Sequence, residues 1–391
     1  MVAATFIDRL GGTIIFPFFS LYIAQKFNVG MTQIGILFGL WSLSGIMGSM
    51  IGGALTDKIG RRTMIIVALI LSATTSILMG VVNELIIFGV VAIIVGTLAD
   101  MGGPAQNAMV ADLLPEEQRA EGFGILRVVA NIAWVIGPMI GGFLANINYL
   151  WLFILDAITS SITAAIVYFT LPETKPQSIG QEKQVALMDS IAGYKVISKD
   201  KLFMGYVVIS MFMVMVYTQM YSTLSVYLNR VHNLSPQIYG YMMSMNAGLV
   251  VLFQFLIMRW IKPLPALLVM VGANFLYAIG FGMFGFVSTT WLFFLAMAIV
   301  TFGEMLHIPT SQALVARFAP EDMRGRYNAA AGLSWQVPNI FGTFAAGLVM
   351  DFINPNLVWR AGGLICLITM LGFLWLHPFA KKRFQKEYIS H

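Results

Sequence analysis

Charged residues are scarce in this sequence. Of its 391 residues only 10% are Asp, Glu, Lys or Arg, whereas a water-soluble domain carries about a quarter. The hydrophobic fraction is 58% and the mean hydropathy is +0.81. Because so few polar side chains cannot cover a folded chain in water, the sequence predicts a protein whose solvent is the lipid bilayer.

Cysteine is nearly absent, and several catalytic patterns are missing. Cys366 is the single cysteine, which excludes a disulfide framework and a metal cluster held by thiolates. No P-loop, H-E-x-x-H or G-x-S-x-G pattern occurs, so ATP-driven, zinc-protease and hydrolase chemistries have no support. The positive charges lie in short loops rather than in one patch, which argues against nucleic acid as a partner. We therefore predict a protein that is not an enzyme and binds neither metal nor cofactor.

Apolar stretches of about twenty residues recur twelve times, each long enough to cross a membrane as a helix. One long polar segment interrupts the series after the sixth stretch. We predict an all-α membrane protein of twelve transmembrane helices in two six-helix bundles. The predicted divisions are a first bundle over 1–170, a cytoplasmic loop over 171–202, a second bundle over 203–378 and a cytoplasmic tail over 379–391.

Lys and Arg are distributed unevenly between the two predicted ends of the helices. Most of the 23 fall on the side that holds the central loop and both termini, while Lys26, Arg230 and Arg360 fall on the other side. Since cytoplasmic loops carry an excess of Lys and Arg, the sequence predicts a multi-pass protein of the cytoplasmic membrane with both termini in the cytoplasm.

The two predicted bundles are related in sequence. A gapless shift of 205 residues aligns "GGPAQNAMVADLLPEEQR" with "HIPTSQALVARFAPEDMR" and matches Gly137 to Gly342. Two six-helix units repeated in parallel orientation are typical of one large class of transporters, whose binding site lies near the middle of the membrane. The repeat therefore predicts a transporter.

The loop "GGALTDKIGRRT" at residues 52–63 joins the second and third predicted helices. Its glycines, acid and arginines resemble the loop signature of the major facilitator superfamily; they are Gly53, Asp57, Gly60, Arg61 and Arg62. In that family the arginines hold a carboxylate at the cytoplasmic end of helix 4, a place that Asp112 occupies here. The resemblance implies a cytoplasmic latch that favours the outward-facing state.

A second motif lies in the fifth predicted helix, "ANIAWVIGPMIGGFLA". Gly137, Pro138, Gly141 and Gly142 resemble the antiporter signature of the twelve-helix drug:proton antiporters in that superfamily. Glycines four residues apart let a partner helix pack closely, and proline bends the helix. The alternative is ordinary small-residue packing, because the upstream glycines of the signature are replaced by alanines.

Six ionisable residues inside predicted helices are candidates for proton coupling or substrate binding: Asp8, Arg9, Asp100, Arg127, Glu304 and His307. Together with Asp156, the acids outnumber the bases, so some carboxylates are expected to exchange a proton for a cationic cargo. Two alternatives stay open. Asp100 and Arg127 can form a structural salt bridge, and Asp156 can be a packing or gating hydrogen bond.

Polar and aromatic residues of the predicted helices are expected to line the transport cavity. They are Asn131, Trp134, Tyr217, Gln219, Tyr221, Asn246, Trp335, Gln336 and Asn339. The 26 methionines suit a surface that binds varied compounds, although methionine also fills gaps in any core.

The resemblance implies alternating access in a protein that acts as a monomer on a small molecule. We expect a secondary transporter that exports lipophilic or cationic small molecules in exchange for protons, with the proton gradient as its energy source. A proton-driven symporter of a specific nutrient, a lipid or lysolipid transporter and a transport-inactive sensor are the alternatives.

Overall fold

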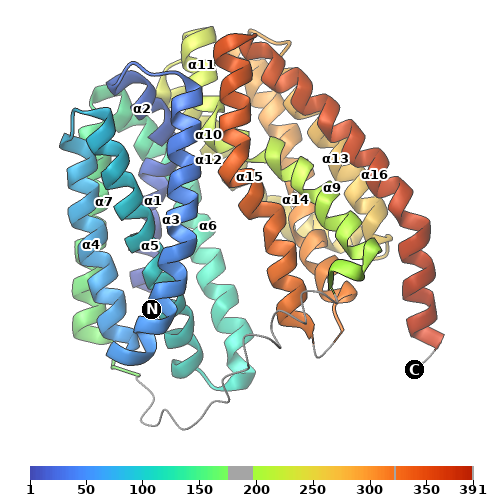
Figure 1. Ribbon diagram of the computed structural model, residues 1–391, viewed down its shortest axis with the longest axis horizontal. Helices are drawn as coiled ribbons and strands as arrows, with labels where there is room; N and C mark the ends of the chain where they lie inside the picture. Colours follow the sequence, from blue (N-terminus) through green and yellow to red (C-terminus); the bar gives the residue numbers. More distant parts are fainter. Residues whose placement is uncertain (175–196, 321–322, 390–391) are drawn as a thin grey trace. The chain divides into compact units, whose positions relative to one another are not determined.

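The computed structural model describes residues 1–174, 197–320 and 323–389 (Figure 1). Throughout these ranges the chain forms helices joined by short turns, and no β-strand occurs among them. The predicted all-α fold is confirmed. For some helical residues, including Gly53, Asp57 and Asp100, the structure describes the helix but not the residue's surroundings.

The helices of the first repeat follow one another with short connections. They are α1 (Val2–Ile15), η1 (Phe16–Phe18), α2 (Phe19–Lys26), α3 (Met31–Ile59), α4 (Arg61–Val81), α5 (Leu85–Leu113), α6 (Glu116–Ile147) and α7 (Leu150–Thr170). Those of the second repeat are α9 (Lys201–Tyr217), α10 (Gln219–Ser222), α11 (Leu224–His232), α12 (Pro236–Ile261), α13 (Ala266–Phe284), α14 (Thr290–Phe318), α15 (Arg324–Phe352) and α16 (Pro355–Ile389).

Eleven helical spans in the described part of the chain are long and apolar enough to cross a membrane. The twelfth long helix is α15, whose 29 residues are sufficient in length but include Arg324, Arg326, Gln336 and Asn339. These polar residues lower its hydropathy without interrupting the helix. The twelve-helix architecture therefore consists of the eleven apolar spans and α15.

The sequence repeat reappears in the helix boundaries. The first residues of α4 and α13, Arg61 and Ala266, lie 205 positions apart, and α5 and α14 correspond at both ends. The first span is interrupted by the 3-10 turn η1, which contains Pro17. The seventh span is interrupted around α10, at the corresponding place. Both repeats thus share the same irregularity.

The chain divides into two compact units. The first contains Met1–Ile179 and Tyr221–Gly248, and the second contains Gly180–Met220 and Leu249–His391. In the first unit Gly142 of α6 faces Gly240 of α12, and a Cβ built on Gly142 would lie 3.2 Å from the Cα of Gly240. This close approach explains why the start of α12 packs with the first repeat. The predicted division into 1–170 and 203–378 follows the repeat and stays a prediction.

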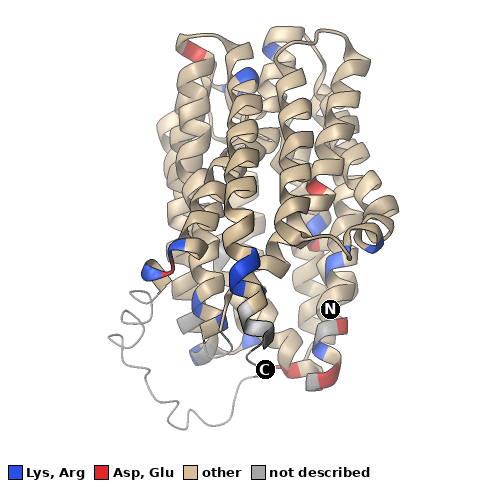
Figure 2. Ribbon diagram, turned by 90° about the vertical axis from the view of Figure 1, so that its right-hand side faces the viewer, with Lys and Arg blue, Asp and Glu red and all other residues tan. Residues whose placement is uncertain are grey.

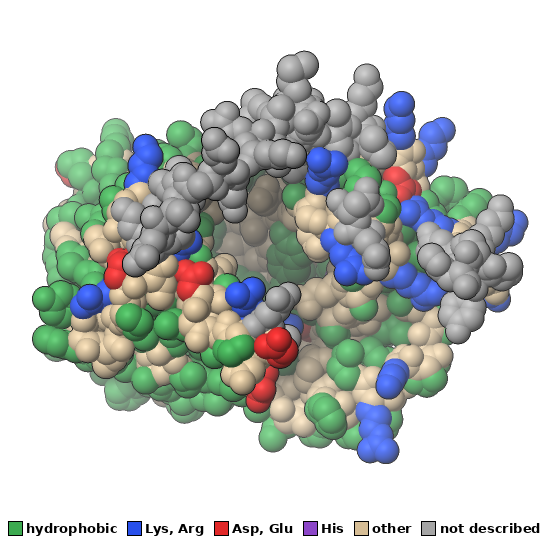
Figure 3. Space-filling view, turned by 90° about the horizontal axis from the view of Figure 1, so that it is seen from below, with side chains coloured by type: hydrophobic (Ala, Val, Ile, Leu, Met, Phe, Trp, Pro, Cys, Tyr) green, Lys and Arg blue, Asp and Glu red, His purple; other side chains and the backbone are tan. Residues whose placement is uncertain are grey.

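Within each unit, Lys and Arg gather at one end of the helices (Figure 2). In the second unit this end carries Arg259, Lys262, Arg317 and Lys381, whereas Arg360 lies near the start of α16 at the other end. Basic and acidic side chains are exposed there in the view of Figure 3. The asymmetry predicted from the loops is therefore present in the folded units.

A carboxylate at the start of α9 connects three helices of the second unit. Asp200 accepts hydrogen bonds from the Phe203 amide at 3.1 Å, the Tyr327 hydroxyl at 2.8 Å and the Arg383 guanidinium at 2.7 Å. Burial opposes ionisation of Asp200, but these hydrogen bonds outweigh it and lower the pKa of Asp200. The network fixes α9 against α15 and α16.

Candidate functional site

The first unit contains a cavity of about 430 Å³ among α1, α3, α4, α5, α6 and α7. Its charged lining consists of Asp8 and Arg9 from α1 and Asp156 from α7. The polar lining comprises Thr13, Ser72, Ser76, Gln106 and Ser160. Two carboxylates and one guanidinium therefore face one chamber inside a membrane-spanning helix bundle.

Small residues of α1 bring the two acids together. A Cβ built on Gly11 would lie 2.8 Å from Asp156 Oδ1, so the absence of a side chain at Gly11 lets α7 approach. Two residues further on, Thr13 donates a hydrogen bond to the Ala133 carbonyl of α6 at 3.1 Å. A Cβ on Gly137, one turn along α6, would lie 2.0 Å from Thr13 Oγ1. The sequence G-G-T in α1 thus packs this helix against both neighbours.

Asp8 and Asp156 line the same cavity, so their carboxylates repel each other when both are ionised. Arg9, which follows Asp8 on α1, lines the cavity as well, and Ser76 of α4 donates a hydrogen bond to the Phe153 carbonyl of α7 at 3.4 Å. Among the described residues of the lining, one guanidinium accompanies two carboxylates, which gives them a net charge of −1 when both acids are ionised.

Aromatic rings form another part of the chamber and its surroundings. Phe16 at the break in the first span packs edge-to-face on Trp134, with ring centroids 6.2 Å apart. Tyr221 contacts both rings, at 6.0 Å from Phe16 and 5.5 Å from Trp134. The predicted cavity residues Trp134 and Tyr221 are therefore neighbours. Aromatic faces of this kind attract cations.

The second unit holds a different arrangement, a series of aromatic rings in contact. Trp335 contacts Tyr217 at 5.8 Å, Tyr217 contacts Tyr277 at 6.0 Å, and Tyr277 contacts His307 at 5.8 Å between ring centroids. His307 is 2% exposed, and its Nδ1 has no hydrogen-bond partner among the described residues. Glu304 lies one turn earlier on α14 and is half-buried. The structure thus joins three of the predicted residues through Tyr277.

The remaining predicted residues are dispersed. Gln219 donates a hydrogen bond to the Met215 carbonyl of its own span at 2.8 Å, and Asn246 is buried in α12. Asn131 is half-buried on α6, while Arg127, Gln336 and Asn339 are exposed. The backbone of Asp100 lies in α5, but its side chain is not among those described, so its predicted role stays a prediction.

The predicted latch loop brings Arg61 and Asp112 together. Arg61 Nε lies 3.2 Å from Asp112 Oδ2, which links the start of α4 to the end of α5. Arg62 makes a different contact, because its guanidinium donates to the Tyr168 carbonyl at the end of α7 and lies 5.0 Å from the Tyr168 ring. The surroundings of Gly53 and Asp57 are not described, so their predicted roles in this loop stay predictions.

Glu173, which sequence reasoning did not single out, occupies the N-terminus of α4. It accepts hydrogen bonds from the Arg62 and Thr63 amides, each at 3.2 Å. Gly60 has a φ of +100°, and a Cβ there would lie 2.5 Å from Glu173 Oε2. Burial opposes ionisation of Glu173, yet the backbone hydrogen bonds outweigh it and lower the pKa of Glu173. Gly60 therefore provides the turn and the space for this carboxylate.

The glycines of the fifth predicted helix lie at close helix crossings. Gly137 faces Thr13, and a Cβ on Gly141 would lie 2.3 Å from the Ile14 carbonyl oxygen of α1. Pro138 is buried within α6, and a Cβ on Gly240 would lie 2.4 Å from its carbonyl oxygen. The motif therefore sets the position of α1, which carries Asp8.

The sequence analysis named Asp156 as an acid inside a helix with a packing or gating role, but nothing local indicated that it shares a cavity with Asp8. It did not single out Tyr277. Tyr277 lies in a uniformly apolar helix, where a buried tyrosine has no distinguishing pattern. The sequence feature that could have suggested the Asp8–Asp156 pair is that both acids lie inside predicted helices, the first and the sixth.

A membrane protein of two parallel six-helix repeats, with an ionisable chamber among its helices, has the architecture of a secondary transporter. Residues 1–343 match the Major Facilitator Superfamily. The chain is 26% identical to a Na⁺, Li⁺, K⁺/H⁺ antiporter of Planococcus maritimus, over 94% of this chain and 93% of that protein. It is 23% identical to the multidrug resistance protein MdtH of Escherichia coli (strain SE11), over 96% and 92%.

Solved structures agree on the fold. The crystal structure of the nucleoside transporter NupG superposes with a TM-score of 0.80 at 14% identity, covering 96% of this chain and 97% of that one. The chain belongs to the Major Facilitator Superfamily. It is a multi-pass membrane transporter of small molecules and not an enzyme, as the sequence predicts.

Proposed function

We propose that this transporter exports lipophilic cations in exchange for protons, and that Asp8 and Asp156 form the exchange site. The observation that carries the proposal is the pairing of two carboxylates with one guanidinium in one chamber. The described lining has a net charge of −1 when both acids are ionised, which one proton or one monovalent cation balances, so the two ligands compete for the same place. The nearby rings of Phe16 and Trp134 supply the apolar and cation-attracting surface that a lipophilic cation requires.

The proposed cycle couples the two fluxes through this competition. A cation enters from the cytoplasm and displaces the proton from the acid pair, after which the transporter opens outward. A proton from outside then binds the pair and releases the cation, and the protonated form returns inward. The proton gradient is the energy source, and no cofactor takes part. The exchange requires alternating access, because the same site must open first to one side of the membrane and then to the other.

The same proposal includes a latch and an orientation. The Arg61–Asp112 ion pair lies at the basic end of the first unit and is proposed to stabilise one state and to break in the other. We place this end and both termini in the cytoplasm, with the chain in the cytoplasmic membrane, because Lys and Arg concentrate there. A monomer is proposed to be the transporting form.

An alternative cargo is an alkali cation. The similarity to a Na⁺, Li⁺, K⁺/H⁺ antiporter favours it. So does the set of oxygen atoms in the chamber with the acid pair, which come from Ser72, Ser76, Ser160 and Thr13. Small hard cations prefer such oxygen ligands. The two cargoes differ in their need for the aromatic rings.

The test uses purified protein in liposomes with an imposed proton gradient, with ethidium as the lipophilic cation and Na⁺, Li⁺ or K⁺ as the alternative. We expect Asp8→Asn and Asp156→Asn each to lower gradient-driven ethidium flux by about a hundredfold or more. Asp351→Asn, which neutralises an exposed acid at the end of α15, is the matched control and is expected to retain the flux.

Other outcomes would redirect the proposal. If only alkali cations respond to the gradient, and Trp134→Leu leaves that flux intact, the alkali-cation antiporter replaces the drug exporter. If ethidium flux ignores the proton gradient in the unmodified protein, proton-coupled efflux is wrong, and the nutrient symporter and lipid transporter become the leading hypotheses. If the flux responds but both Asn variants retain it, the site assignment is wrong and the function stands.

A further inference from the structure

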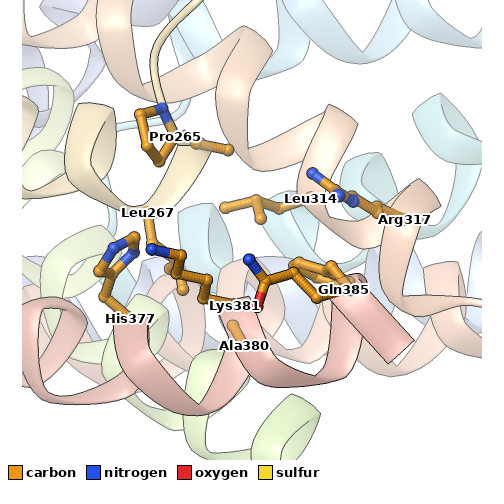
Figure 4. Close-up of a pocket in the computed structure, with 10 residues that line it drawn as sticks. Pro265, Leu267, Leu314, Arg317, His377, Ala380, Lys381 and Gln385 are labelled. Carbon is orange, nitrogen blue, oxygen red and sulfur yellow. The ribbon is translucent and has the colours of Figure 1, made fainter. Parts of the chain in front are cut away.

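The second unit contains a separate cavity of about 630 Å³ at its basic end (Figure 4). It lies where the start of α13, the end of α14 and the last turns of α16 meet. Its polar lining consists of Arg317, His377, Lys381 and Gln385, and its apolar lining of Pro265, Ala266, Leu267, Leu314, Ala380 and Phe384. None of the ten described lining residues is acidic.

The basic side chains converge from two helices. In Figure 4, His377 and Lys381 of α16 lie on one side of the cavity and Arg317 of α14 on the other. Arg317 rests on the Phe384 ring, with its guanidinium carbon 4.2 Å from the ring centroid. No carboxylate of the described residues lies within ion-pair distance of Arg317 or Lys381. Its described lining therefore combines basic side chains with apolar walls.

The surface next to the cavity is apolar and exposed. Leu264, two residues before the first residue of α13, is 55% exposed, and Leu374, one turn before His377 on α16, is 47% exposed. Exposed aliphatic side chains beside basic residues suit a lipid, whose acyl chains contact the apolar groups while its headgroup meets the basic ones. This surface distinguishes a lipid ligand from a free anion, which would gain nothing from it.

The corresponding place in the first repeat already holds an anion of its own. There the start of α4 receives the Glu173 carboxylate through the Arg62 and Thr63 amides. Pro172 follows the end of α7, where the chain leaves the helix and Glu173 turns back. In the second repeat α16 continues to Ile389, Pro378 stands at the position of Glu173, and no side chain of the described residues caps the start of α13. The second repeat thus has the basic cavity, and no carboxylate of its described residues takes the place of Glu173.

We propose that this cavity binds the phosphate headgroup of an anionic phospholipid. Arg317 and Lys381 contact the phosphate from opposite sides, His377 and Gln385 complete the polar contacts, and the acyl chains extend along Leu264 and Leu374. Basic pockets between transmembrane helices are suited to such headgroups because two or three cationic groups act on one phosphate in a partly dry setting.

The test titrates short-chain phosphatidylglycerol into the full-length, detergent-solubilised transporter and counts bound lipid by native mass spectrometry. We expect Arg317→Gln combined with Lys381→Gln to weaken binding about thirtyfold, since each basic group near a headgroup contributes roughly fivefold. Lys382→Gln removes the same charge one residue away, outside the cavity, and is expected to change binding less than twofold. Melting temperatures of all variants establish that they are folded.

A second variant adds a charge instead of removing one. His377→Glu places a carboxylate one turn from Lys381 within the cavity, so it should displace the phosphate and abolish the preference for phosphatidylglycerol over phosphatidylcholine. Binding that is equal for the two lipids in the unmodified protein would overturn the proposal. So would a loss with Lys382→Gln as large as with the double variant. Displacement of the lipid by millimolar inorganic phosphate would assign the cavity to a free anion instead.

Discussion

The starts of α4 and α13 correspond in the two repeats, but they are stabilised differently. At α4, Gly60 with its φ of +100° makes room for the Glu173 carboxylate, which accepts two backbone amides at 3.2 Å. At α13, Pro265 precedes the helix and no described side chain caps it. The same helix start therefore binds a carboxylate of the chain in one repeat and borders a basic cavity in the other.

A similar contrast separates the interiors of the two units. The chamber of the first unit holds Asp8, Arg9 and Asp156, whereas the second has the buried rings of Tyr217, Tyr277 and His307 in its interior. The two repeats thus share the break in their first span and the bounds of α5 and α14, while their polar residues differ. We therefore propose different roles for the two units, ion exchange for the first and lipid binding for the second.

The largest effect on stability is expected at the repeat-related pair Gly137 and Gly342. A Cβ on Gly137 would lie 2.0 Å from Thr13 Oγ1 and 3.0 Å from the Thr13 backbone, whereas on Gly342 it would lie 3.2 Å from the flexible end of Gln219. Gly137→Ala should therefore cost about 2–3 kcal/mol through overpacking, and Gly342→Ala less than about 1 kcal/mol. Thermal unfolding in detergent measures both. Equal losses would show that α6 and α15 pack alike.

An intermediate effect is expected from the two carboxylates that cap helices. Asp200 combines an amide, a hydroxyl and a guanidinium, so Asp200→Asn should cost about 2 kcal/mol through its charge-assisted hydrogen bonds. Glu173 is exposed, and Glu173→Gln should cost about 1 kcal/mol or less, as for other caps. The measurement is again thermal unfolding. A larger loss at Glu173 would reverse the ranking of these networks.

The smallest effect concerns pH. The folded protein lowers the pKa of both Asp200 and Glu173, so each carboxylate stabilises the fold above its unfolded pKa near 4, and that stabilisation disappears as the pH falls through the lower folded value. The melting temperature should therefore decline on acidification below about pH 4. The decline should be shallower in Asp200→Asn. A decline of equal steepness in that variant would mean that other groups cause it.

Sequence reasoning reached the fold because membrane-spanning helices obey a length and hydropathy rule that each stretch satisfies by itself. It also identified Asp8, Arg9, Trp134 and the Arg61–Asp112 neighbourhood, since each is anomalous or part of a spaced motif. It did not reach the Asp8–Asp156 pair, because the two acids lie in different helices with no local signal joining them. It also gave no indication of the cap formed by Glu173, which depends on how the turn after α7 folds back.

The sequence by itself determined that the protein lies in a lipid bilayer, that it has twelve helices in two repeats, and that Lys and Arg concentrate at one end of the helices. Each of these depends on composition within a window of about twenty residues and on Lys and Arg in loops. What only the tertiary structure decided is which polar groups share a chamber, a helix start or a cavity. Those contacts depend on close approaches between helices, set at positions such as Gly11, Gly60 and Gly137, where the missing side chain determines which neighbour fits.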